Sequence, residues 1–161
     1  IIVAGFPLSR FLSSSVKVTK GIVSSLAGAK NNYSQIQIDA AIQPGNSGGP
    51  IVDDKGNVVA VAVATLDKKW FLRERGNIPE NTNFGIKSST ARSFLEANSI
   101  RLRPPRSKMA SKNELTRLLV AGTHFLSCWT TWAEHRRTAK AHKRTFDVSP
   151  ALYREVERLQ R

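Results

Sequence analysis

The feature that most constrains the fold of this chain is a series of short, β-branched, apolar segments separated by turn residues over its first ninety positions. These segments cover residues 16–26, 34–40, 50–66 and 81–87. In the second segment, Ile36 and Ile38 alternate with polar neighbours, which is the period of a strand with one buried face. Gly21 interrupts the first segment and predicts a bend or bulge there. Strands of this length and spacing are typical of an antiparallel barrel or sandwich, so we predict a mainly β fold.

The pattern changes to helical after residue 88. A helix that ends near Asn98 is predicted, with Ser88 or Ser89 as its N-cap. Ser111 followed three residues later by Glu114 is a capping-box sequence and predicts the start of a second helix.

Three regions follow from these patterns. Residues 1–100 form the β-rich region and its closing helix, whereas residues 101–112 combine two prolines with basic side chains and are predicted to be a linker. Residues 113–161 are predicted to be a basic helical extension.

The charge of the chain is concentrated in that extension. The net charge of the 161 residues is +13, and the larger part of it lies after residue 100. A basic surplus can neutralise nucleic acid, anionic lipid or an acidic partner. Tryptophans are interleaved with basic residues in the extension: Trp129, Trp132, Arg136, Arg137, Lys140, Lys143 and Arg144. Two interpretations stay open, a helical hairpin packed on the barrel, or an arm that binds nucleic acid or an anionic membrane surface.

Cysteine content and hydropathy exclude some classes of protein. The single cysteine, Cys128, excludes an internal disulfide and a cysteine-based zinc site. Residues 118–133 are apolar but too short and too polar to span a bilayer. The first residues show no signal-peptide pattern and read as a strand, which predicts that the chain begins inside a domain.

The chemistry-bearing motif is Gly45-Asn46-Ser47-Gly48-Gly49-Pro50. A serine hydroxyl is a weak nucleophile, so acyl transfer requires it on a sharp turn beside N–H groups that stabilise the oxyanion. Glycines permit the positive φ angles of such a turn, and the N–H groups of Gly45 and Ser47 are the candidate donors. By itself, this motif also fits a glycine-rich hairpin turn.

The flanking sequence favours the first interpretation. Residues 37–64, QIDAAIQPGNSGGPIVDDKGNVVAVAVA, resemble the second barrel of trypsin-like (chymotrypsin-fold) serine peptidases, most closely the HtrA/Deg-like bacterial branch. The resemblance extends over roughly residues 3–98. Elements in the family's order are GFPLS (5–9), TKGIVSSL (19–26), QIDAAI (37–42), the serine loop, and NFGIK (83–87) with its terminal helix. The resemblance implies a six-stranded antiparallel barrel, with residues 1–100 as the C-terminal half of a two-barrel peptidase domain.

The resemblance also implies an activity and a site. The activity is that of a serine endopeptidase with an acyl-enzyme on Ser47, without metal or cofactor, and the oxyanion loop is Gly45, Asn46 and Ser47. Ala41 falls at the floor of the specificity pocket, which predicts a small or medium apolar residue before the scissile bond. The edge strand that pairs with an extended polypeptide substrate comprises Ala62, Val63, Ala64 and Thr65. A periplasmic or other extracytoplasmic location is implied by the family alone.

The base that would activate Ser47 is missing from its family position. In this fold the histidine and the aspartate of the triad precede the serine. All three histidines, His124, His135 and His142, follow it. We therefore expect a truncated form, in which the missing N-terminal barrel is the partner that supplies His and Asp. Its absence would expose an apolar face and lower the solubility. The alternative is a catalytically inactive remnant that binds peptides along its edge strand.

The acidic residues near the motif offer no substitute for this base. Asp39 is predicted to accept a hydrogen bond from a neighbouring loop, and Asp53 and Asp54 are predicted turn residues.

Overall fold

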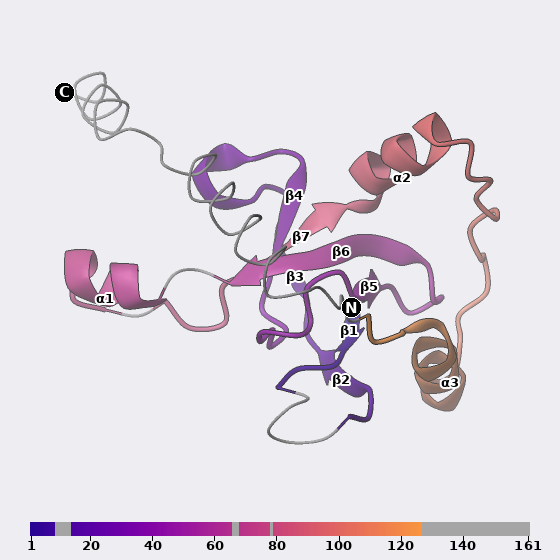
Figure 1. The fold of residues 1–161 in the computed structure, drawn as a ribbon, viewed down its shortest axis with the longest axis horizontal. Helices are drawn as coiled ribbons and strands as arrows, with labels where there is room; N and C mark the ends of the chain where they lie inside the picture. Colours follow the sequence, from indigo (N-terminus) through magenta and orange to yellow (C-terminus); the bar gives the residue numbers. More distant parts are fainter. Residues whose placement is uncertain (9–13, 66–67, 78, 127–161) are drawn as a thin grey trace, which may run out of the picture. The chain divides into compact units, whose positions relative to one another are not determined.

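The structure, a computed structural model, describes residues 1–8, 14–65, 68–77 and 79–126. Within these ranges it contains one curled, fully antiparallel sheet with helices around it (Figure 1). The strands are β1 Ile2–Gly5, β2 Lys17–Lys20, β3 Val23–Ser25, β4 Gln35–Ile38, β5 Pro50–Val52, β6 Val58–Thr65 and β7 Asn83–Lys87. The helices are η1 Ala29–Asn31, α1 Lys68–Arg75, α2 Ser88–Ala97 and α3 Lys112–Gly122. The predicted mainly β fold is confirmed.

The two edge strands of the sheet belong to one bent segment of the chain. Its strand order is β2-β1-β5-β6-β7-β4-β3, so β2 and β3 lie at opposite edges although only Gly21 and Ile22 separate them in the chain. A Cβ atom on Gly21 would lie 2.2 Å from Asp39 Oδ1 and 2.5 Å from the Ala40 nitrogen, so no side chain fits at the bend. Counted as one bent strand, β2 and β3 make this seven-stranded sheet the six-stranded barrel of the prediction. The predicted bend at Gly21 is also confirmed.

The barrel interior is narrow. It is filled by Val3, Ile36, Ile38, Ala40, Ile42, Ile51, Ala60 and Ala62. Ala60 and Ala62 of β6 are fully buried in the interior, whereas Val58 on the same strand is 49% exposed. Opposite them, a Cβ atom on Gly85 would lie 2.5 Å from Ile51 Cδ1. Small residues are therefore required where β6 and β7 face the centre of the barrel.

The two predicted helix starts have different outcomes. α3 begins as predicted, because Ser111 Oγ accepts a hydrogen bond from the Glu114 N–H at 3.3 Å. The predicted serine cap of α2 is wrong, since Ser88 is already helical and Lys87 is the cap residue. The cause is that β7 continues through Lys87 and leaves no extended residue between strand and helix.

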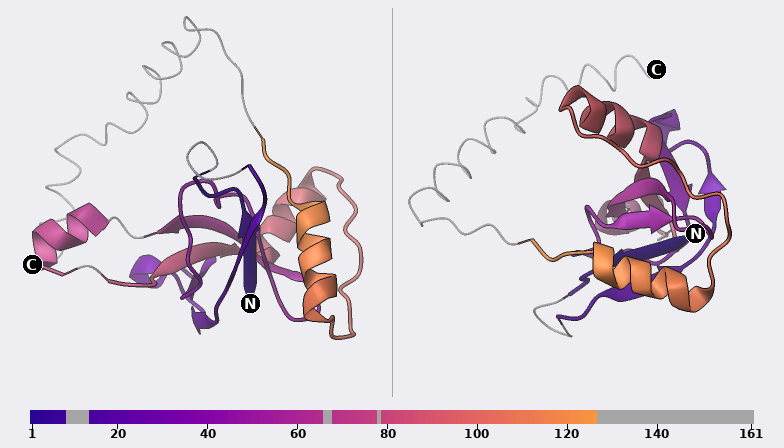
Figure 2. Two further views of the ribbon diagram at one scale, coloured as in Figure 1. Left: turned by 90° about the horizontal axis from the view of Figure 1, so that it is seen from below. Right: turned by 90° about the vertical axis from the view of Figure 1, so that its right-hand side faces the viewer.

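α3 packs on the outer face of the sheet. Leu119 is 5% exposed and forms a second buried cluster with Ala4 of β1 and Val52 of β5. In the right-hand view of Figure 2, α3 lies beside β1. None of the described helices is long and apolar enough to cross a membrane.

The segment between α2 and α3 has no regular secondary structure but is tied to the barrel. The side-chain amide of Asn57 donates to the Arg106 carbonyl at 3.0 Å and accepts from the Arg106 N–H at 2.7 Å. The Ala110 N–H donates to the Asp54 carbonyl at 3.0 Å. Residues Ile1–Phe125 form one compact unit. The sequence-based boundary at residue 100 stays a prediction. The predictions for Cys128, His135, His142, Trp129 and Trp132 concern positions outside the described residues.

Candidate active site

The serine loop consists of two consecutive four-residue turns that share Asn46. The Asn46 N–H donates to the Gln43 carbonyl, and the Gly49 N–H donates to the Asn46 carbonyl, both at 2.9 Å. The third residue of each turn is a glycine with positive φ, 105° at Gly45 and 83° at Gly48. Type II turns require a positive φ at this position, so both glycines are needed by the backbone. The turns place Ser47 at an exposed position.

Asn46 anchors the loop in the barrel. Its side chain is 1% exposed, and its Oδ1 accepts from the Gln43 N–H at 3.1 Å. The N-terminal strand approaches it closely, because a Cβ atom on Gly5 would lie 2.9 Å from Asn46 Nδ2. The Phe6 N–H donates to the Gly45 carbonyl at 3.1 Å. The conformation of the serine loop therefore depends on the segment that follows β1.

Two backbone N–H groups of the serine loop have no described hydrogen-bond acceptor. Within the described ranges, the N–H groups of Gly45 and Ser47 donate to no acceptor, whereas those of Asn46, Gly48 and Gly49 all do. Donors held in this way by a fixed backbone are the kind that stabilise an oxyanion. The structure thus brings Ser47 and its two predicted donors together on one loop.

The strand next to this loop has a free edge. β5 pairs with β6 as far as Val61, and Ala62 exchanges hydrogen bonds with Gly48 and Gly49 at 2.7 and 2.9 Å. From Val63 onwards, no described backbone group pairs with this edge of β6, although the other edge continues along β7 to Thr65. The register shifts between Ala62 and Ala64, so Val63 is a bulge, a feature common beside active sites.

The free edge therefore comprises Val63 to Thr65. Ala62, which the sequence also placed in the substrate-pairing strand, has both backbone groups occupied by the serine loop. The Val63 carbonyl accepts a hydrogen bond from Ser47 Oγ at 3.1 Å.

Ala41 lies at the surface just before the serine loop. It is exposed, and its carbonyl accepts from Thr19 Oγ1 at 3.0 Å. The neighbouring Ala40 is buried, and its carbonyl accepts from Asn83 Nδ2 at 2.7 Å. The chain before the loop is thus held by β2 and β7, while the role of Ala41 in substrate selection stays a prediction.

The nearby carboxylates have structural roles. Asp39 Oδ1 accepts from the Ile22 N–H at 2.6 Å, which confirms the predicted contact with a neighbouring loop. Asp53 Oδ1 accepts from the N–H groups of Lys55 and Asn57 at 2.9 and 2.8 Å, which confirms its place in a turn. Partial burial acts to raise the pKa of Asp53, but the hydrogen bonds from Asn57 and Lys55 and the Lys55 charge outweigh it and lower this pKa below its ordinary value.

No base for Ser47 lies among the residues that the structure describes. His124 is exposed beyond the end of α3 and makes no hydrogen bond to Ser47. Oγ of Ser47 donates to a backbone carbonyl, which cannot accept its proton in catalysis.

Comparison with known proteins agrees with this geometry. Residues 1–61 match the family described as trypsin-like peptidase domain. The chain is 44% identical over 95 residues to the uncharacterized protein y4bJ of Sinorhizobium fredii, covering 59% of this chain and 15% of that protein. It is 37% identical over 100 residues to Protease Do-like 2, chloroplastic, of Arabidopsis thaliana, and this match covers 59% of this chain and 15% of that protein. It is 41% identical over 69 residues to the serine protease Do-like HtrA of Bacillus subtilis, and this match covers 38% of this chain and 15% of that protein.

A curled antiparallel barrel with a serine on a double glycine turn is the architecture of trypsin-like serine peptidases. The match over residues 1–61 and the similarity to Do-like proteases support the assignment of this chain to a trypsin-like, HtrA/Do-type serine peptidase. The chain spans only 15% of the length of these relatives.

Proposed function

We propose that Ser47 is the nucleophile of a serine endopeptidase that hydrolyses peptide bonds through an acyl-enzyme. The observation that carries this proposal is the arrangement around Ser47. Ser47 is exposed, the N–H groups of Gly45 and Ser47 on its loop have no described acceptor, and Ser47 Oγ contacts the Val63 carbonyl, where the free edge of β6 begins. A peptide paired along Val63 to Thr65 would pass directly beside Ser47, whose Oγ already contacts the Val63 carbonyl.

In the proposed reaction, Ser47 Oγ forms a bond to the substrate carbonyl carbon while a base removes the hydroxyl proton. The negative oxygen of the tetrahedral intermediate accepts hydrogen bonds from the N–H groups of Gly45 and Ser47. The C–N bond then breaks, and the base returns the proton to the leaving amine. Water, deprotonated by the same base, hydrolyses the resulting ester and regenerates the serine.

The base and its orienting carboxylate are proposed to come from an N-terminal barrel outside these 161 residues. Two observations support this proposal. All histidines of the chain follow Ser47 in the sequence, and the chain corresponds to a small fraction of each Do-like relative. With the base absent, a triad enzyme keeps only the contribution of its oxyanion hole and binding, about 10³-fold over water.

A fluorophosphonate probe tests the proposal, because it labels a serine only where a base activates the hydroxyl. We expect the product of the natural gene to label at Ser47, and Ser47→Ala to abolish this labelling. Ser93→Ala, on the exposed face of α2, is the matched control and should label normally. Intact mass and peptides mapped upstream of Ile1 report whether a His and an Asp precede the chain. A folded natural product that carries both residues and does not label would refute the proposed nucleophile.

A second candidate function is peptide binding without catalysis, which the free edge of β6 favours because it requires no base. Fluorescence anisotropy of a labelled, extended apolar peptide separates the two functions. Binding that is unchanged by Ser47→Ala, together with no labelling by the probe, would support a binding module.

The basic tail provides a further alternative at a different place in the chain. Nucleic acid or anionic membrane binding through residues 113–161 would weaken steeply between low and moderate salt. A flat salt response would remove this alternative.

A further inference from the structure

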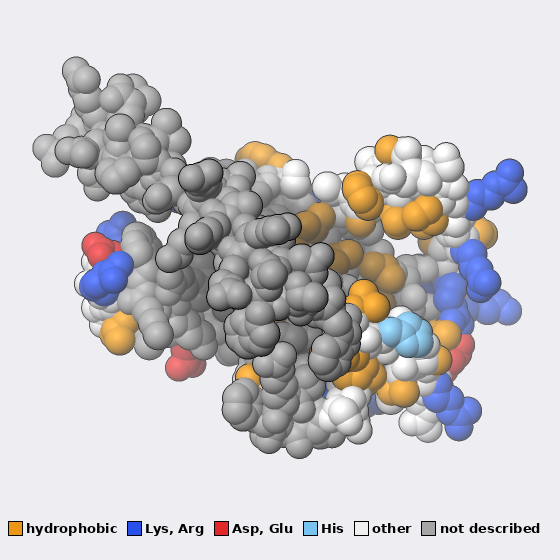
Figure 3. All heavy atoms as spheres, viewed as in Figure 1, with side chains coloured by type: hydrophobic (Ala, Val, Ile, Leu, Met, Phe, Trp, Pro, Cys, Tyr) orange, Lys and Arg blue, Asp and Glu red, His pale blue; other side chains and the backbone are white. Residues whose placement is uncertain are grey.

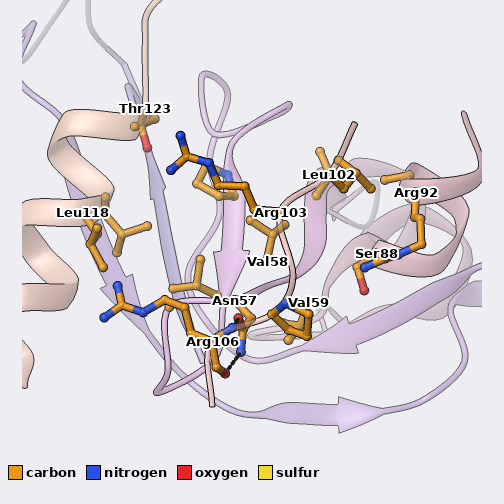
Figure 4. A pocket seen from close by; sticks show the side chains of 18 of the residues that line it. Asn57, Val58, Val59, Ser88, Arg92, Leu102, Arg103, Arg106, Leu118 and Thr123 are labelled. Carbon is orange, nitrogen blue, oxygen red and sulfur yellow. Dashed lines mark hydrogen bonds between the residues drawn. The ribbon is translucent and has the colours of Figure 1, made fainter. Parts of the chain in front are cut away.

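A pocket separate from the serine loop lies between the β5–β6 hairpin, α2, the segment before α3, and α3 itself (Figure 4). Its volume is about 780 Å³, and its lining includes no residue from Ala41 to Gly49. Pockets of roughly 300 to 1,000 Å³ are the usual size of small-ligand sites. The peptidase chemistry proposed for Ser47 makes no use of this space.

The walls of the pocket are apolar and held in place. Aliphatic side chains from four elements and the connecting segment line it, among them Val52, Val58, Val61, Leu95, Leu102 and Leu118. The two hydrogen bonds between Asn57 and Arg106 fix one wall, and the burial of Leu119 against the sheet fixes another. In Figure 3, hydrophobic side chains gather on the face between α2 and α3.

The charged side chains that line the pocket are all cationic. They are Arg92, Arg103 and Arg106, and no carboxylate is among the described lining residues. Arg92 pairs with Glu96 at 3.6 Å, and Arg106 pairs with Glu114. Arg103 makes no ion pair or hydrogen bond with any residue in the described ranges. The Arg103 guanidinium, which lies beside an apolar surface, therefore has no anionic partner among the described residues.

An unsatisfied hydroxyl lies in the same pocket. Thr123, which caps α3, is 8% exposed, and its Oγ1 has no hydrogen-bond partner among the described residues. In the view of Figure 4, the Arg103 side chain extends over the pocket toward Thr123. Leaving a buried hydroxyl without a partner costs free energy, so such a group often marks the position of a missing ligand atom.

The backbone around the pocket limits what can occupy it. β6 is paired with β5 from Val58 to Val61 and with β7 from Ala60 onwards, so both of its edges are occupied at Ala60 and Val61. An extended peptide lying over these two residues would find no free strand edge and would bury its own N–H groups without partners. An acyl chain carries no such groups and needs only apolar contact.

We propose that this pocket binds a long-chain carboxylate of the fatty-acid type. The carboxylate accepts hydrogen bonds from the Arg103 guanidinium and from Thr123 Oγ1. The acyl chain lies on the aliphatic floor formed by Val58, Val61 and Leu118. This site provides the anion that Arg103 lacks and the partner that Thr123 lacks, and it removes apolar surface from water.

Displacement of a dansylated undecanoate probe from the full 161-residue chain by monomeric myristate tests the proposal. We expect Arg103→Met, which removes the charge and keeps an apolar stem, to weaken myristate binding about tenfold. Thr123→Val, which keeps the shape and removes the hydroxyl, should weaken it about threefold or more. Arg101→Met is the matched control, since Arg101 is exposed and lies outside the pocket lining, and its affinity should be unchanged. Circular dichroism of each variant reports whether the fold is kept.

The length of the acyl chain provides an independent readout. Each added methylene from octanoate upward should tighten binding about fourfold until the pocket is filled, whereas tetradecanol, without the anion, should bind more weakly than myristate. Failure of myristate to displace the probe, or equal effects of Arg103→Met and Arg101→Met, would overturn the proposal. Binding to anionic phospholipid vesicles without binding of monomeric myristate would overturn it as well, because it would indicate surface adsorption instead of a pocket.

Discussion

At the scale of single residues, the two turn glycines of the serine loop differ in their surroundings. A Cβ atom on Gly48 would meet nothing within 4 Å, whereas one on Gly45 would lie 2.3 Å from the Phe6 carbonyl oxygen. Gly48→Ala should therefore lower the free energy of unfolding by only about 1–2 kcal/mol, the cost of the positive φ. Gly45→Ala should cost more, because the loop must also separate from Phe6. Urea denaturation measures both, and equal costs would show that the Phe6 contact does not restrict the loop.

Asp53 predicts a pH dependence of stability. Burial acts to raise its pKa, but the hydrogen bonds from Asn57 and Lys55 and the Lys55 charge lower it below 3.8. Because the folded pKa is below the unfolded one, the stabilisation is complete above the unfolded pKa and is lost as the pH falls through the folded pKa. The difference in unfolding free energy between the natural chain and Asp53→Asn should therefore shrink from about pH 6 to pH 3. Asp54→Asn is the matched control, because the Asp54 side chain makes no described hydrogen bond.

The sequence predicts those site residues whose geometry is set by their own turn, and it does not predict those whose geometry is set by strand pairing. Ser47 and its N–H donors follow from the glycine spacing, because a positive φ is a property of the residue and its turn. Two other features depend on the register of β5 against β6. They are the pairing of both Ala62 backbone groups with the serine loop and the hydrogen bond from Ser47 to Val63. That register shifts between Ile51 and Val52, the pairing of β6 with β7 shifts at Val63, and no local sequence pattern encodes either shift.

At the scale of elements, alternation and turn residues were enough to predict the strands. α1, Lys68–Arg75, was not predicted. Asp67, which precedes it in the sequence and is a residue type favoured at N-caps, was the signal that could have indicated it. The linker prediction for residues 101–112 considered composition alone. It could not include Asn57, whose side chain bonds to a backbone 49 positions away.

Asn57→Ala should release that segment. Both hydrogen bonds between the Asn57 side chain and the Arg106 backbone are lost, and the bond from the Ala110 N–H to the Asp54 carbonyl is the one described hydrogen bond that remains between the segment and the hairpin. Limited digestion with trypsin should therefore cleave after Arg106 and Lys108 several-fold faster. Asn32→Ala is the matched control, because the one described hydrogen bond of the Asn32 side chain is local, to the N–H of Ser34. Unchanged cleavage rates would mean that the segment is held by other contacts.

At the scale of the whole molecule, the compact unit runs to Phe125, beyond the region that the sequence attributed to the barrel. α3 was predicted as a helix, and one of the two interpretations of the extension packed it on the barrel, but the strands that it contacts were not predicted. The reason is that Leu119 meets Ala4 and Val52, two residues from strands far apart in the sequence. An amphipathic pattern indicates that a helix has a buried face and does not indicate which surface covers it.

Leu119→Ala measures whether α3 and the barrel unfold together. Leu119 is 5% exposed and packs on β1 and β5, so its truncation should lower the free energy of unfolding of the whole unit by about 2–5 kcal/mol. Leu118→Ala, at a side chain that is 42% exposed, should cost much less. Denaturation followed by amide hydrogen exchange at the buried strands β4 and β7 provides the readout. If Leu119→Ala lowers protection in α3 alone, the helix is a separate extension; if it lowers protection in the strands equally, α3 is an integral part of the barrel unit.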